Sequence, residues 1–160
     1  MVKEYVDERQ IKSRMSRPST RSYEEAHLLA VRNIAEQLFP FPTPEYPHFR
    51  TFVNEPEAEQ KIVTNYGNEL EPDIVVLQWP EKLPVMVAEV VTPDMLREDV
   101  AENIWAVEAR LDGVQFYLYV PAGQASQAKK LLKQAKIKDV QLRTWRNHLG
   151  LNSLDIAPIK

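Results

Sequence analysis

Two β-rich segments in the middle of the chain constrain its fold more than any other feature. Residues 73–79 (DIVVLQW) and 85–91 (VMVAEVV) are dominated by β-branched and other apolar side chains, which favour strands. Only five residues, Pro80 to Pro84, separate the two segments, so we expect an antiparallel hairpin. The rest of the fold must be built around this hairpin.

The flanking segments predict an α/β fold. A first helix is expected over residues 22–39, because Ser22 and Glu25 form a capping box and Pro40 ends the helical period. The remaining expected elements are helices over 96–111 and 122–135 and strands over 48–53, 60–66, 114–120 and 140–145. The acidic stretch 55–59 is interpreted as a hairpin loop between the strands 48–53 and 60–66. We expect strand 114–120 to lie parallel to strand 85–91, because a helical crossover joins them.

The domain organisation is expected to be simple. We interpret residues 1–21 as an N-terminal arm and residues 22–160 as a single domain, which is long enough to bury a core. Residues 147–160 either complete a partner interface or cover the core. The N-terminal segment is charged and every apolar run is short, so we expect a cytoplasmic protein with no membrane segment.

Two acidic residues, Asp73 and Glu89, interrupt the apolar strands. If Trp79 pairs with Val85, the two carboxylates share one face of the sheet as diagonal neighbours, with backbones roughly 7–8 Å apart. Carboxylates in that arrangement are hard oxygen ligands suited to Mg²⁺ or Mn²⁺, and such an ion can activate water for attack on phosphorus. The alternative is that Asp73 hydrogen-bonds locally and Glu89 lies at a solvated strand end.

Composition excludes several other chemistries. The chain has no cysteine, which removes disulfides, thiolate metal sites and thiol nucleophiles. Its four glycines form no phosphate-binding loop. The three histidines, His27, His48 and His148, lie far apart in the sequence without an acid at a recognisable spacing, so we interpret them as incidental. Oxygen ligands remain as the plausible chemistry.

The helix expected over 96–111 carries one polar residue close to its apolar stripe. At 100° per residue, Asn103 lies within or beside the stripe formed by Leu96 and Val100, so it is expected to face the sheet near Asp73 and Glu89. Trp105 is expected to point nearly opposite. Trp105 and Trp145 are interpreted as packing or interface residues, with base stacking as the alternative.

Pro72-Asp73, followed by Glu89 two positions before residue 91, resembles the PD-(D/E)XK nuclease motif. The expected α-β-β-β-α-β order, with an added helix and strand, resembles the restriction-endonuclease-like core, a mixed β-sheet flanked by helices. Residues 89–93 (EVVTP), Asp99 and residues 113–121 (GVQFYLYVP) are similar to a large bacterial group of endonuclease-like proteins, mostly of unassigned function.

The resemblance implies a site. Asp73 and Glu89 would be metal-binding carboxylates for Mg²⁺ or Mn²⁺. Glu24 or Glu25 would match an additional acid that many members carry, and Glu24 is preferred because the capping box accounts for Glu25. The motif lysine would stand at position 91, which is Val91, or at the displaced position that aligns with Asn103. The implied catalytic set is therefore Asp73, Glu89 and Asn103, without a positive charge. Arg97 or Lys82 are the nearby candidates to supply that charge.

A basic stretch near the C-terminus is the candidate contact for DNA. Residues 129–146 contain a single acid, Asp139, and seven basic residues, Lys129, Lys130, Lys133, Lys136, Lys138, Arg143 and Arg146. They predict either a phosphate-binding patch or a solvated helix face. The net charge of −3 averages this stretch with an acidic segment, residues 55–73.

The resulting hypothesis is a metal-dependent nuclease with a degenerate active site, and fold precedent suggests a homodimer. The alternatives are a catalytically inactive binding or structural module of the same fold, and an unrelated α/β domain.

Overall fold

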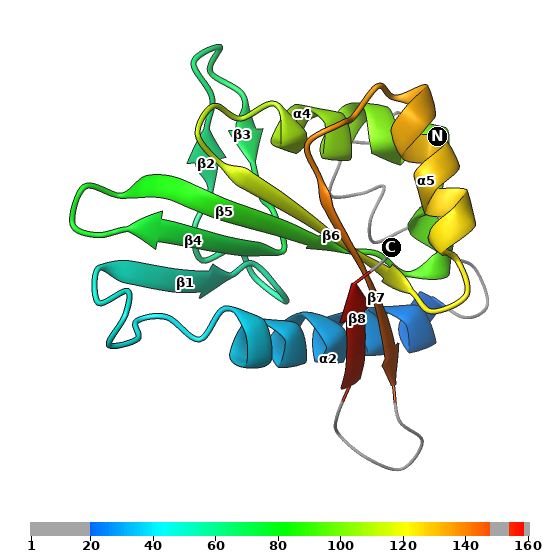
Figure 1. Ribbon diagram of the computed structural model, residues 1–160, viewed down its shortest axis with the longest axis horizontal. Helices are drawn as coiled ribbons and strands as arrows, with labels where there is room; N and C mark the ends of the chain where they lie inside the picture. Colours follow the sequence, from blue (N-terminus) through cyan, green and yellow to red (C-terminus); the bar gives the residue numbers. More distant parts are fainter. Residues whose placement is uncertain (1–19, 148–153, 159–160) are drawn as a thin grey trace.

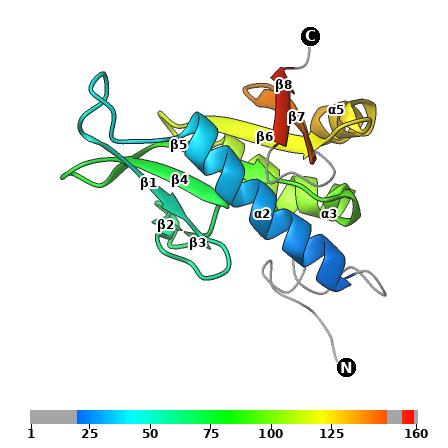
Figure 2. The same ribbon diagram turned by 90° about the horizontal axis from the view of Figure 1, so that it is seen from below.

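The computed structural model describes residues 20–147 and 154–158 of the chain and shows a β-sheet between two layers of helices (Figure 1). Helix α2 (Thr20–Leu38) runs across one face of the sheet (Figure 2). The other face carries α3 (Glu98–Val100), α4 (Ala106–Ala109) and α5 (Ala125–Gln134). The mixed α/β fold with flanking helices is confirmed.

The main sheet has six strands in the order β1-β4-β5-β6-β7-β8. Their bounds are β1 (Phe49–Val53), β4 (Ile74–Gln78), β5 (Leu83–Val90), β6 (Gln115–Pro121), β7 (Gln141–Asn147) and β8 (Leu154–Pro158). Strands β5, β6 and β7 are parallel to one another, and the other pairings are antiparallel. The expected parallel pairing across the helical crossover is therefore confirmed.

The two faces of the sheet bury separate apolar cores because side chains alternate along each strand. Ile74 and Val76 of β4 pack towards α2, with Ile34 and Trp145. Val75 and Leu77 of β4 pack towards the α3–α5 layer. Near-continuous burial of β4 on both faces explains why its sequence is an uninterrupted apolar run.

The central hairpin is confirmed as antiparallel, but its register differs by two residues from the expected one. Val76 pairs with Met86, whereas the expected register pairs it with residue 88. Leu83 and Pro84 belong to β5 and not to the loop, so the turn is tighter than five residues. The register shifts between Val76 and Leu77, opposite Pro84, which is a position where a sheet tolerates proline.

The expected hairpin between residues 48–53 and 60–66 is wrong. Strand β1 pairs with β4, and residues 60–66 contribute only β2 (Ile62–Val63), which pairs with β3 (Glu69–Leu70) in a separate two-stranded sheet. The acidic stretch after β1 therefore leads away from the main sheet. The prediction paired residues 48–53 with the next apolar segment in the sequence. In the structure β1 pairs instead with β4, which is almost wholly buried.

The helix expected over residues 96–111 is interrupted. A 3₁₀ turn, Pro93–Met95, precedes α3, and a π-helical turn, Ala101–Trp105, joins α3 to α4. A π turn contains an extra residue, so a projection at 100° per residue loses phase across it. Trp105, expected to point away from the sheet, is buried with 1% exposure, and Asn103, expected to face the sheet, is exposed.

The ends of the chain bear on three further predictions. Helix α2 begins at Thr20, two residues before the expected capping box, and ends one residue before the expected boundary. The predicted N-terminal arm, residues 1–21, lies almost entirely outside the described residues, as does much of segment 147–160. Strand β8, within that last segment, pairs with β7.

Candidate metal centre at the strand ends

Three polar side chains from separate elements converge at one end of the sheet. They are His27 of α2, Glu55 just after β1, and Asp73 just before β4, and we call them the strand-end cluster. His27 Nδ1 lies 3.3 Å from Glu55 Oε1, and His27 Nε2 lies 3.2 Å from Asp73 Oδ2. One ligand atom from each residue lies within 4.8 Å of the other two.

Asp73 is held between the two neighbouring strands. Its Oδ2 accepts a hydrogen bond of 2.8 Å from the backbone N–H of Val90 on β5. Its backbone carbonyl accepts a hydrogen bond of 3.0 Å from Asn54 N–H at the end of β1. The carboxylate is thus positioned by the sheet itself, and its side chain is 1% exposed.

Asn54 fixes the loop that carries Glu55. Its Nδ2 donates to the carbonyls of Gln60 (2.8 Å) and Pro72 (2.7 Å). Its Oδ1 accepts from the backbone N–H groups of Glu59 (2.7 Å) and Gln60 (2.8 Å). With 4% exposure, Asn54 uses its full amide to join the loop after β1 to the residue before Asp73.

The protonation of His27 decides how the cluster holds together. Each ring nitrogen faces a carboxylate, and only a doubly protonated imidazole can donate to both. A cation on the ring would then offset two negative charges. The same three residues each offer one ligand atom within 4.8 Å of the others, so a divalent metal ion, which would take one ring nitrogen of His27, is the alternative counter-charge. The side chains of His27 and Glu55 are 14% and 30% exposed, so the cluster opens to solvent on their side.

Glu89, the second predicted metal ligand, is buried but lies outside this group of donors. Ile74 pairs with Ala88, so one step further along the same register Asp73 lies directly opposite Glu89. The two residues are therefore closer than in the expected diagonal arrangement. The neighbouring odd positions Val87 and Val91 pack towards the α3–α5 layer. The Asp73 carboxylate instead turns at the strand end and contacts His27 of α2.

The remaining predicted residues are not among the three donors of the strand-end cluster. Glu24 is exposed on α2, one turn before His27. Val91, at the motif-lysine position, is buried in the apolar core. Arg97 forms a bidentate ion pair with Asp99 (3.0 and 2.6 Å). Lys82 lies at the far end of the β4–β5 hairpin, over the Trp79 ring at 5.2 Å, and cannot reach the site.

Sequence reasoning missed His27 and Glu55. His27 is separated from Asp73 by 46 residues, and although it was interpreted as incidental, it contacts two carboxylates. Glu55 belongs to the acidic stretch interpreted as a loop, and nothing in the sequence distinguishes it from the other acids there. The only local signal was the position of His27 in an amphipathic helix, near the buried Ala30 and Val31.

Comparison with known proteins assigns no family. No protein-family profile matches the chain, and searches of curated proteins and of solved structures find no significant match. Among the residues that the structure describes, no helix has the length and apolar character needed to cross a membrane.

Proposed function

We propose that the protein binds one divalent metal ion at His27, Glu55 and Asp73 and hydrolyses phosphodiester bonds of nucleic acid. The observation that carries the proposal is the convergence of three donor atoms within 4.8 Å from α2, the end of β1 and the start of β4. Side chains so far apart in sequence meet at this distance only because the fold brings them together.

The donor set fits a metal ion. Two carboxylates offset the charge of a divalent cation, and the imidazole adds a nitrogen ligand. This combination suits Mn²⁺ or Zn²⁺ better than Mg²⁺, which prefers oxygen ligands and retains much of its water. Three protein ligands also leave positions for water and substrate, as in catalytic sites.

The topology supports the same proposal. The chain order α2, β1, β4, β5, α3–α4, β6 follows the α-β-β-β-α-β pattern, with β2–β3 inserted and α5, β7 and β8 added. The first three strands are antiparallel neighbours, and β6 adds parallel to β5. We therefore propose a restriction-endonuclease-like core.

The residues of the chain have distinct roles in this proposal. Bound at the strand-end cluster, a divalent ion supplies Lewis acidity towards a phosphoryl oxygen. Asp73 holds its carboxylate in place through the Val90 N–H, and Asn54 positions the loop of Glu55. The partly exposed side of Glu55 and His27 admits the substrate. Glu89 and Glu24 remain predicted contributors.

A specific observation favours a second candidate, a nuclease-fold protein that binds metal or nucleic acid without turnover. Val91 is buried and apolar where the motif implies lysine, Asn103 is exposed, and Arg97 is paired with Asp99. Loss of such an electrostatic stabiliser costs about 10²–10³ in rate. We therefore expect weak hydrolysis at most.

The lysines of the predicted DNA contact in residues 129–146 lie away from the proposed metal site. Lys129 and Lys133 belong to α5, on one face of the sheet, whereas His27 belongs to α2 on the other. Trp145, a candidate for base stacking, is buried and donates to the carbonyl of Val91 (3.1 Å). Substrate binding at the cluster is therefore proposed without these lysines.

Titration calorimetry with Mn²⁺ tests the metal site. We expect binding to the wild type, and a loss of at least about tenfold in affinity for Asp73→Asn and His27→Ala, because even the loss of a group that only orients a ligand costs about 10–100-fold. His48→Ala is the matched control, because His48 is exposed and outside the cluster. Equal affinity of all four proteins would reject the site.

Cleavage of supercoiled plasmid in Mn²⁺ then separates the two candidate functions. Nicking that disappears in Asp73→Asn and persists in His48→Ala supports the enzyme. Metal binding without cleavage supports the non-catalytic module. Glu89→Gln in the same assay tests whether the second predicted carboxylate contributes to either property.

A further inference from the structure

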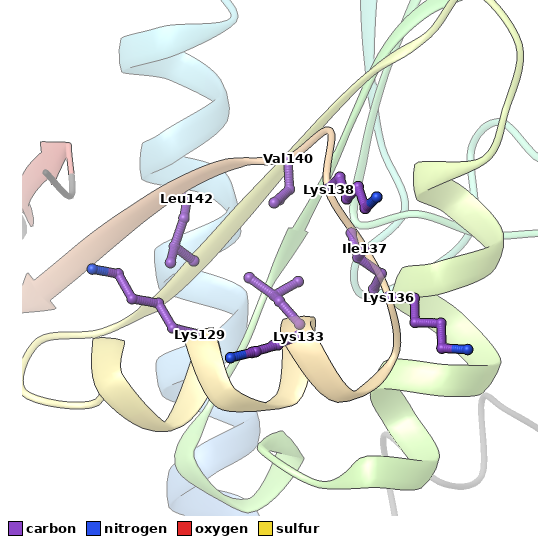
Figure 3. A pocket seen from close by; sticks show the side chains of 8 residues that line it. Lys129, Lys133, Lys136, Ile137, Lys138, Val140 and Leu142 are labelled. Carbon is purple, nitrogen blue, oxygen red and sulfur yellow. The ribbon is translucent and has the colours of Figure 1, made fainter.

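A groove rimmed by lysines lies between the end of α5 and the start of β7 (Figure 3). Its volume is about 710 Å³, and its floor is aliphatic, including Leu132 and Ile137. We call it the lysine groove, and its rim consists of Lys129, Lys133, Lys136 and Lys138. Among the described side chains, no acid lies within ion-pair distance of Lys133, Lys136 or Lys138.

The end of helix α5 builds this groove. Ile137 N–H donates to the carbonyl of Leu132 (2.9 Å), and Lys136 N–H donates to that of Lys133 (3.1 Å). Lys136 takes a left-handed conformation with φ of 60°. These are the bonds of a Schellman motif, which brings Ile137 against Leu132. The apolar floor and the lysine rim are thus one local structure.

The lining indicates what kind of partner fits. Four cationic side chains call for an anionic surface, which also rejects basic partners. The lining contains no aromatic side chain, so it offers no platform on which bases can stack. Aliphatic groups on the floor instead favour an apolar side chain. An acidic segment with an exposed apolar anchor satisfies both requirements.

The chain presents such a segment, residues 57–71, which we call the acidic hairpin. It contains β2 and β3, with Tyr66 92% exposed and Val63 64% exposed. Its charged residues are Lys61 and four acids, Glu57, Glu59, Glu69 and Glu71. Lys61 pairs only loosely with Glu69 (3.4 Å) and Glu71 (3.7 Å). The segment is therefore acidic and apolar at its surface.

The turn of the acidic hairpin is well fixed. Thr64 N–H donates to the carbonyl of Asn68 (2.8 Å), and Gly67 N–H donates to that of Thr64 (3.0 Å). Gly67 adopts φ of +85°, which glycine reaches without strain. Tyr66 is therefore presented on a pre-organised turn, which lowers the entropic cost of binding. Exposed tyrosines of this kind are typical binding anchors.

We propose that the lysine groove binds the acidic hairpin of a second copy of this chain, with Tyr66 on the aliphatic floor. Figure 1 shows β2–β3 and α5 at opposite ends of the layer that contains α4, so one molecule cannot fill its own groove. The contact is heterologous, because two different surfaces meet. Association is therefore head-to-tail and continues beyond two copies unless a ring closes. The inference is independent of the metal site.

Sedimentation velocity tests this association. We expect the wild type to form salt-sensitive oligomers that grow with concentration at about 0.05 M salt and dissociate at about 0.5 M. Lys133→Glu and Tyr66→Ser should each weaken association roughly tenfold or more. Lys130→Glu is the matched control, because it makes the same charge change on α5 outside the groove. Circular dichroism confirms that each variant is folded.

Mixing the two variants gives the sharpest result. The Lys133→Glu protein keeps an intact hairpin, and the Tyr66→Ser protein keeps an intact groove. An equimolar mixture should therefore form 1:1 dimers and nothing larger, while each variant alone stays monomeric.

Three outcomes would overturn the proposal. The first is a wild type that stays monomeric at high concentration and low salt. The second is equal loss of association in Lys130→Glu and Lys133→Glu. The third is a monomeric wild type that binds a labelled single-stranded oligonucleotide, with binding lost in Lys133→Glu and kept in Tyr66→Ser. That result would assign the groove to nucleic acid.

Discussion

The strand-end cluster and the lysine groove are the two polar sites that the structure brings forward, and they are built in opposite ways. The cluster joins side chains from positions 27, 55 and 73, one of them almost fully buried. The groove is formed within one continuous segment, and its lysines are exposed at the surface. The first depends on the whole sheet, and the second on the end of α5 and the start of the strand that follows it.

This difference has energetic consequences. Buried polar groups must be satisfied, so a change near the cluster disturbs the fold as well as the chemistry. Exposed lysines are solvated and their charges contribute little to stability, so reversing those charges alters association instead. The predictions below test this contrast, from the largest expected effect to the smallest.

Asn54→Ala should have the largest effect. The substitution removes four hydrogen bonds from a buried position and leaves the loop after β1 without its connection to Pro72. We expect a loss of about 3 kcal/mol in the free energy of unfolding, measured by urea denaturation. Asn65→Ala, at an exposed position, should change it by less than about 0.5 kcal/mol. Similar values for both variants would show that Asn54 does not support the cluster.

Mn²⁺ should stabilise the wild type through the cluster and not through the groove. At a free Mn²⁺ concentration of about 100 times the dissociation constant, the expected gain is about 2.7 kcal/mol. Thermal unfolding with and without Mn²⁺ measures it. The gain should disappear in His27→Ala and remain in His48→Ala and Lys133→Glu. A gain that survives in His27→Ala would place the metal elsewhere.

Lys136→Gly should have the smallest effect and the opposite sign. Lys136 occupies a left-handed conformation that glycine adopts without a steric cost, so we expect a gain of about 1 kcal/mol in urea denaturation. Lys133→Gly is the control, because residue 133 lies inside α5, where glycine costs about 1 kcal/mol. A loss of stability in both variants would contradict the Schellman geometry at this helix end.

The same contrast explains how far the sequence predicted the molecule. The β4–β5 hairpin and the parallel strand β6 followed from apolar runs, prolines and the crossover length. The pairing of β1 did not, because the nearest apolar segment in sequence is not its partner in the sheet. The phase of the α3–α4 segment failed at the π turn, where a uniform helical period no longer applies.

The candidate site was predicted only in part. Asp73 stood out as an acid at the start of a buried strand, and it is the residue that the structure surrounds with two other side chains able to bind a metal. His27 and Glu55 gave no comparable signal, because nothing near them in sequence marks their approach to Asp73. Glu89 was singled out by the same argument as Asp73. Whether it takes part in the strand-end cluster depends on the direction of its own side chain, which the sequence pattern does not give.

The sequence by itself determined the local features of this protein: the alternating and continuous apolar runs, the order of the main helices and of the central strands, the lysine-rich helix end and the acid at position 73. Only the tertiary structure decided which strands pair, that Trp105 is buried and Asn103 exposed, and that His27 meets Asp73. Local patterns depend on interactions between residues close in sequence. Contacts across 46 residues depend on how whole elements pack, which no local period encodes.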